Sequence, residues 1–177
     1  MVNPGHAAAV FARLAGDPGM LGEVRRTLRA GPAAALLGPL GRLLPSDLSP
    51  RDERDWLDVA ALVARVGAAP ARGAGVPLAG LAGLRSREPQ IRPGIERRFL
   101  AVVEAERDDL PNRLAGLVAV LGDAAGRIDW GALAADIGRW SFDESPIQRA
   151  WARSYRAAAG ITPDLDTQAA QTETEGD

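Results

Sequence analysis

Clusters of arginine are the part of this sequence that could do chemistry. They comprise Arg25, Arg26 and Arg29; Arg97 and Arg98; and Arg149, Arg153 and Arg156. Residues spaced three, four or seven apart share one face of a helix, so the first and third clusters each put several guanidinium groups on one surface. Guanidinium groups bind phosphate oxygens without reading base sequence. The clusters therefore predict contact with an anionic polymer, with an ordinary solvated helix face as the open alternative for each.

Carboxylate pairs are the candidates for catalysis, since two acids can hold metal ions for hydrolysis. The pairs are Asp52–Glu53, Asp108–Asp109 and Asp143–Glu144. All three lie at predicted helix starts, where carboxylates stabilise the helix dipole, and adjacent helix residues point in different directions. His6, the one histidine, has no partner motif, and no Walker loop or nucleophile elbow is present. We expect no catalytic residue, no metal site and no cofactor; a metal-dependent hydrolase is the lesser alternative.

Composition favours a helical protein of the cytoplasm. Among the 177 residues there is no cysteine, so disulfides and thiolate metal sites are excluded. No apolar run is long enough for a membrane span, and the first residues lack the pattern of a secretory signal. Leucine and alanine dominate while β-branched residues are sparse, which favours helices over sheets. We expect a soluble, cytoplasmic, all-α protein without membrane contact.

The net charge of −2 conceals an uneven distribution. Residues 157–177 carry five acids and no base, which leaves residues 1–156 with a net charge of +3. All 21 basic residues are arginine. This usage is also typical of a GC-rich genome, so arginine content alone does not indicate nucleic-acid binding. Local basic patches, not a strong overall field, are what this balance predicts.

Helix signals divide the chain into two helical lobes and a tail. The first lobe, residues 1–90, has predicted helices at about 4–15, 20–30, 36–44 (kinked at Pro39), 50–66 and 78–85. Ser49 and Pro50 give the clearest start, with Asp52, Glu53 and Asp55 favouring the positive end of the dipole. Residues 67–90 form its loop-rich connection, because glycine and proline are frequent there.

The second lobe, residues 91–160, is predicted to hold four helices. Asp108 or Asp109 caps the second, Asp129 caps the third, and Ser145 opens the fourth with a capping box. Four tryptophans lie in phase with the apolar residues: Trp56, Trp130, Trp140 and Trp151. We expect them in the core, with base stacking as the alternative. Residues 161–177 are acidic and poor in large apolar groups, so we expect a disordered tail.

The C-terminal half resembles a known family. Its points of similarity are Glu96-Arg97-Arg98 before an apolar run, Ile128-Asp129-Trp130 at a helix start, Trp140, and Trp151, Ala152 and Tyr155 in the last helix. In this order over residues 91–156, they resemble the CasB family, the small subunit of the type I-E CRISPR surveillance complex called Cascade. The resemblance implies a non-catalytic scaffold that binds nucleic-acid backbone and stabilises the guide–target heteroduplex and the displaced strand.

The resemblance also implies partners and assigns positions. Implied partners are the Cascade backbone and large subunits, a second copy of the chain, the guide RNA and both strands of the target DNA. Arg25-Arg26 and Arg97-Arg98 occupy places where relatives carry basic pairs. Glu104, Ala115 and Gly116 stand where some relatives are basic, a departure for which Arg113, one turn from Gly116, could compensate. The open alternative is a helical adaptor that contacts proteins only.

The acidic tail can be tested by deletion. Deleting residues 161–177 should leave the fold intact, since their few apolar groups cannot repay the entropy of ordering. Tethered carboxylates should compete with phosphate for the arginine faces, so the shortened chain should bind a single-stranded oligonucleotide more tightly at low salt. The difference should fade as salt rises. Equal affinities at low ionic strength, measured by fluorescence anisotropy, would contradict the competition.

Overall fold

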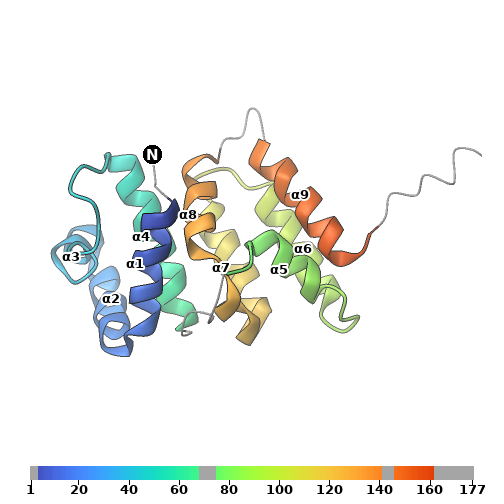
Figure 1. Cartoon of the computed structure of the whole chain (residues 1–177), viewed down its shortest axis with the longest axis horizontal. Coiled ribbons are helices and arrows are strands. Elements are labelled where there is room, and N and C mark those ends of the chain that lie inside the picture. The colour runs from blue at the N-terminus through green and yellow to red at the C-terminus, as the bar shows by residue number, and fades with distance from the viewer. Residues whose placement is uncertain (1–3, 68–74, 141–145, 162–177) are drawn as a thin grey trace, which may run out of the picture.

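The computed structural model describes residues 4–67, 75–140 and 146–161, and these residues are almost entirely helical (Figure 1). The first segment holds α1 (Pro4–Gly16), α2 (Pro18–Ala30), α3 (Pro32–Leu37) and α4 (Pro50–Val66). The others hold α5 (Leu78–Arg85), α6 (Arg92–Val103), α7 (Leu110–Leu121), the 3-10 helix η1 (Gly122–Arg127), α8 (Trp130–Gly138) and α9 (Pro146–Ala159). No β-strand occurs in these ranges, so the predicted all-α class is confirmed.

Side-chain caps begin three of the helices. Asp17 Oδ1 accepts a hydrogen bond from the Met20 amide at 2.9 Å at the start of α2. Ser49 Oγ accepts from the Asp52 amide at 3.1 Å before α4. Asp129 Oδ1 accepts from the Ala132 amide at 2.9 Å before α8. Each bond satisfies an amide that has no carbonyl partner in the first turn, so the caps predicted at Ser49 and Asp129 are confirmed.

Some local predictions were wrong, and others fall outside the described residues. The helix expected at 36–44 instead spans Pro32–Leu37, because Pro32 suits a first helical position and the chain turns at Gly38-Pro39. Asp109 makes no side-chain cap for α7, since its carboxylate accepts from Arg113 Nε at 2.6 Å. The capping box at Ser145 and the tail at 162–177 lie outside the described residues.

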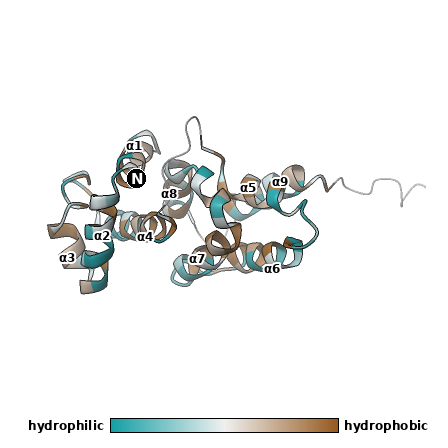
Figure 2. Ribbon diagram, turned by 90° about the horizontal axis from the view of Figure 1, so that it is seen from below, coloured by the Kyte–Doolittle hydropathy of each residue, from teal (hydrophilic) through white to brown (hydrophobic). Residues whose placement is uncertain are grey.

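The helices form two groups (Figure 1), and a single cluster of buried apolar side chains extends through both. Helices α1–α4 lie at one end of the long axis, whereas α5, α6 and α9 lie at the other (Figure 2). Helices α7 and α8 lie between them, with α8 packed on α1 and α4, and α7 packed on α4 and α6. The described helices therefore form two packed groups, and α5, which falls within the predicted first lobe, packs against α6 and α9. The predicted domain limits at residues 90 and 160 stay predictions.

Helix α5 packs against α9 through a close approach of their backbones. A Cβ atom on Gly83 would overlap the carbonyl oxygen of Tyr155 and lie 2.9 Å from the Ala158 Cβ. Only glycine permits this separation. Next to α5, Val76 exchanges backbone hydrogen bonds with the η1–α8 connection: its amide donates to Arg127 at 2.8 Å and its carbonyl accepts from Asp129 at 2.9 Å. The short α5 is thus anchored along its length.

Aromatic side chains join α6, α8 and α9. Trp151 lies edge-on to Trp140 with ring centroids 5.4 Å apart, and Phe99 stacks on Tyr155 at 4.3 Å. The indole nitrogen of Trp151 donates to Asp136 Oδ2 at 2.8 Å, and that of Trp140 donates to the Ala105 carbonyl at 3.1 Å. All four tryptophans of the chain are buried. The prediction that they belong to the core is confirmed.

No helix in the described ranges combines the length and apolar character needed to span a bilayer.

Replacing Trp151 tests the contribution of this aromatic cluster. Trp151→Ala should lower the free energy of unfolding by about 3–5 kcal/mol, because it leaves a cavity among three helices. Trp151→Phe should cost less, since a ring remains while the hydrogen bond to Asp136 is lost. Urea denaturation followed by circular dichroism measures both variants. An alanine variant as stable as the wild type would contradict a core role.

Candidate nucleic-acid interface

The first arginine cluster lies on α2. Arg26 and Arg29 are exposed, and neither has a hydrogen-bond or ion-pair partner among the described residues. Arg25 differs, because its Nε donates to the Ala64 carbonyl in the last turn of α4. That carbonyl has no partner within its own helix, so Arg25 caps α4 in addition to carrying charge. The three arginines predicted as one cluster therefore have different local roles.

The third cluster lies on the outer face of α9. Arg149, Arg153 and Arg156 are exposed, whereas Trp151 and Tyr155 are buried on the opposite side of the same helix. Burial of the aromatic face thus orients the arginine face toward solvent. This is the arrangement that the helical spacing predicted.

The second cluster lies on α6, which packs against both α5 and α9. Arg97 is exposed and has no partner among the described residues. Arg98 is half-buried, and its Nη1 donates to the Gly94 carbonyl at 3.1 Å on its own helix. The charge of Arg113 on α7 is neutralised by Asp109 in an exposed ion pair. With its charge shared with Asp109, Arg113 compensates poorly for the uncharged positions 115 and 116.

The predicted site residues do not form one patch. The α2 cluster lies at one end of the long axis, and the α6 and α9 clusters lie at the other (Figure 1). Two separate basic surfaces on one elongated scaffold suit contact with an extended polymer at two places. A single small anionic ligand could not reach both.

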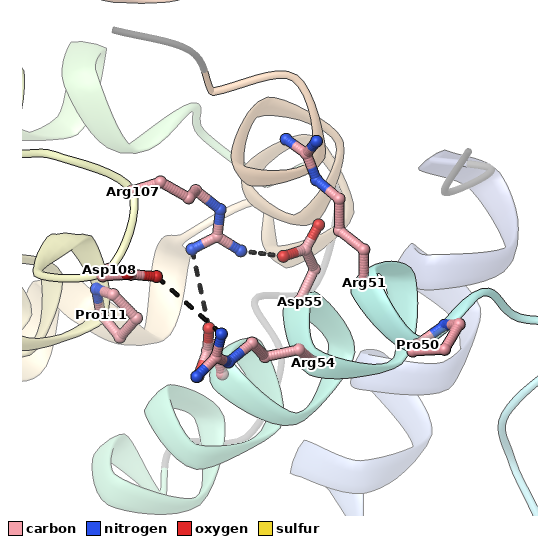
Figure 3. A pocket seen from close by; sticks show the side chains of 8 residues that line it. Pro50, Arg51, Arg54, Asp55, Arg107, Asp108 and Pro111 are labelled. Carbon is pink, nitrogen blue, oxygen red and sulfur yellow. Dashed lines mark hydrogen bonds and ion pairs between the residues drawn. The ribbon is translucent and has the colours of Figure 1, made fainter.

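A hollow between the helix groups contains Arg51, Arg54, Asp58 and Arg107, for which the sequence predicted no role (Figure 3). It is lined by Pro50, Arg51, Arg54, Asp55, Asp58, Arg107, Asp108 and Pro111. Arg107 Nη2 pairs with Asp55 Oδ1, and Arg107 Nη1 lies 3.7 Å from Asp58 Oδ2. The Asp55 side chain is only 2% exposed. A buried carboxylate without a counter-charge is strongly destabilising, so Arg107 holds the α6–α7 connection against α4.

Desolvation governs the titration of this hollow. Burial raises the pKa of Asp58 to about 6, although the nearby Arg54 guanidinium acts in the opposite direction. The 3.7 Å separation from Arg107 is too long for a hydrogen bond that would restore a normal pKa. Burial also lowers the pKa of Arg107, but a guanidinium stays protonated at neutral pH.

Asp55 was expected only to favour the helix dipole, but in the structure it is buried and pairs with Arg107. Asp55 lies one turn before Val59 on the inward stripe of α4, and it is buried. This position in the helical repeat could have predicted the ion pair, because a carboxylate on the same face as core residues requires a cation beside it. His6 is exposed, and its ring lies edge-on to Trp56 with centroids 5.8 Å apart. No group of three or more potential metal ligands occurs among the described residues.

Comparison with known proteins places these helices in a family. The family model described as CRISPR-associated protein Cse2 matches residues 20–155. The chain is 42% identical over 64 residues to the CRISPR-associated protein Cse2 of Thermus thermophilus. That match covers 36% of this chain and 36% of the relative, so it spans about a third of the relative's length.

Solved structures agree over a larger share of the chain. A CRISPR-associated protein of the Cse2 family from Thermus thermophilus superposes with a TM-score of 0.67 and 28% identity, covering 89% of this chain and 99% of that chain. CasB from M. ruber superposes with a TM-score of 0.66 and 26% identity, covering 90% and 96%.

The raised pKa of Asp58 predicts a pH-dependent stability. Between about pH 4 and 6 the unfolded chain releases this proton while the folded chain keeps it, so stability should fall as pH rises. The free energy of unfolding should fall by at most about 3 kcal/mol in total. This fall should be complete once the pH exceeds the pKa of Asp58 in the folded chain. Asp58→Asn should therefore be more stable than the wild type at pH 7 and equally stable at pH 3.5. Urea denaturation at both pH values measures the difference, and parallel pH profiles would contradict the assignment.

Proposed function

The chain belongs to the family of CRISPR-associated protein Cse2, and on this basis we propose that it is the non-catalytic small subunit of a type I-E Cascade. In this role it binds nucleic-acid backbone without sequence specificity. It thereby stabilises the guide–target heteroduplex and the displaced strand. The family match also agrees with the resemblance to CasB found in the sequence, and structures named both Cse2 and CasB superpose on this chain.

The exposed arginine face of α9 is the observation that carries the proposal. Arg153 and Arg156 point away from the core and have no ion-pair partner among the described residues. Keeping like charges together on one helix costs a few tenths of a kcal/mol per pair. Backbone phosphates offset that repulsion and require no particular base. A second basic surface on α2 provides a further contact at the other end of the molecule.

Sequence-independent binding is sufficient for such a subunit. Base pairing with the guide supplies the specificity in RNA-guided complexes, while proteins recognise the shape and charge of the backbone. A modest net charge fits this role, because neighbouring subunits contribute to the electrostatic field that attracts the nucleic acid. We propose the Cascade backbone and large subunits, a second copy, the guide RNA and both target strands as its partners, in the cytoplasm.

The acids of the described residues support a structural role instead of catalysis. Asp52 bonds to Ser49 at a helix start, and Asp129 caps α8. The buried Asp55 pairs with Arg107. Asp136 accepts from the Trp151 indole and pairs with Arg139 at 2.9 Å. Each carboxylate satisfies a neighbouring donor, which is the use expected of a scaffold.

A protein adaptor without nucleic-acid contact is the second candidate. Exposed leucines favour it: Leu37 at the end of α3 is 87% exposed, and Leu100 on α6 is 55% exposed. Single apolar residues are common on protein surfaces, however, so two exposed leucines are weak support for a docking surface. The arginine faces are the stronger feature, so we favour nucleic-acid binding.

A salt titration distinguishes the two candidates. Binding of the full chain to a single-stranded oligonucleotide should weaken linearly on a logarithmic salt scale. The double variant Arg153→Gln/Arg156→Gln should bind all base sequences more weakly and lower the magnitude of the slope by about 1–2. The variant Arg42→Gln/Arg127→Gln, which removes the same charge from exposed positions elsewhere, is the matched control. Absence of salt-dependent binding by the wild type would favour the adaptor.

A further inference from the structure

A hollow between α2 and α4 gathers arginines from both helices. It is lined by Arg25, Leu28, Arg29, Ala61, Ala64 and Arg65, and has a volume of about 500 Å³. Half of its lining residues are cations and the others are apolar, and no carboxylate lines it. Arg65 was not singled out by the sequence, because it stands alone in the last turn of α4. Only the packing of α4 on α2 brings it beside Arg25 and Arg29.

The Arg25 guanidinium is held in a fixed position. Its Nε donates to the Ala64 carbonyl, 39 residues away in the chain. Gly67 provides the space for this guanidinium, because a Cβ at that position would lie 2.6 Å from Arg25 Nη2. With φ at +64°, Gly67 also ends α4 in a left-handed conformation that glycine adopts without strain. Anchoring through Nε leaves both terminal amino groups of Arg25 available as donors.

The other two arginines have uncompensated charge. Neither Arg29 nor Arg65 has a hydrogen-bond or ion-pair partner among the described residues. The C-terminus of α4 contributes a partial charge of about −0.5, which falls short of the three positive charges around the hollow. The hollow therefore keeps a net positive charge. An anion with several oxygens could accept hydrogen bonds from more than one guanidinium at once.

We propose that this α2–α4 arginine hollow binds a backbone phosphodiester of single-stranded nucleic acid, with Arg65 as a binding residue. The inference rests on the proposed function and adds a defined phosphate position to it. Arg25 acts as the preorganised donor, since its rotamer is fixed before binding and less entropy is lost. Arg29 and Arg65 contact the phosphate from the two helices, and no carboxylate in the lining competes for their donors.

The full-length chain and inorganic pyrophosphate provide a direct test of the hollow. In arginine Nε–Hε nuclear magnetic resonance spectra, pyrophosphate should shift the Arg29 and Arg65 signals of the wild type saturably. Arg65→Gln should weaken this binding about tenfold, the effect of losing one charged hydrogen bond. Arg13→Gln removes the same charge from an exposed position on α1 and should change the affinity for pyrophosphate less than twofold. If both variants lose the same affinity for pyrophosphate, the hollow is not a phosphate site.

Oligonucleotides then connect the hollow to the proposed function. Arg65→Gln should weaken binding of a single-stranded oligonucleotide about tenfold more than Arg13→Gln, with DNA and RNA of equal length as separate arms. Loss in the RNA arm alone points to the guide, and loss in the DNA arm points to a target strand. If both variants bind alike, the inference fails while the proposed function stands. If the wild type binds no oligonucleotide, both fail, even where pyrophosphate still binds.

Discussion

Burial of one apolar face on each short helix is the constraint on which the structure depends. Most helices here have fewer than 15 residues and would be marginal in isolation. They are stabilised by packing, most clearly where Gly83 lets α5 approach α9 and where Trp151 fills the space among α6, α8 and α9. The same burial orients the opposite faces outward. The exposed arginines of α9 are therefore a consequence of the aromatic core beneath them.

Charge inside the molecule has a different role from charge on its surface. Arg107 is held by Asp55 in a hollow where both side chains are mostly removed from water. Such buried pairs add little to the free energy of unfolding, but removing one partner is costly. They therefore determine which elements lie together more than they stabilise the fold. Here the pair fixes the α6–α7 connection against α4. Exposed pairs such as Arg113–Asp109 contribute less and are weakened by salt.

The separation of the basic surfaces bears on how a scaffold of this family could work. Arginines at both ends of an elongated molecule allow contacts with a backbone polymer at two distant points. Under the proposed function each contact would be weak, sequence-independent and sensitive to salt, so binding would depend on holding both points at once. The apolar core shared by the helix groups sets the spacing of the two surfaces. Loss of packing should therefore weaken binding even where no arginine is changed.

The sequence by itself determined the features that depend on near neighbours. Ser49 and Pro50 marked the start of α4, Asp129 marked that of α8, and helical spacing separated Arg153 from Trp151 on α9. Caps and helix periodicity act within one or two turns, so they can be read directly from the chain. The order of these elements was also sufficient to indicate the family.

Only the tertiary structure decided which distant charges meet. Arg25 bonds to a carbonyl 39 residues away, and Arg107 pairs with a carboxylate 52 residues away. The sequence could show that a carboxylate at Asp55 needs a cation, but not which one, because the energy of a buried or capping charge depends on what packing brings beside it. The same holds for Arg65, which becomes part of a basic hollow only when α4 lies against α2.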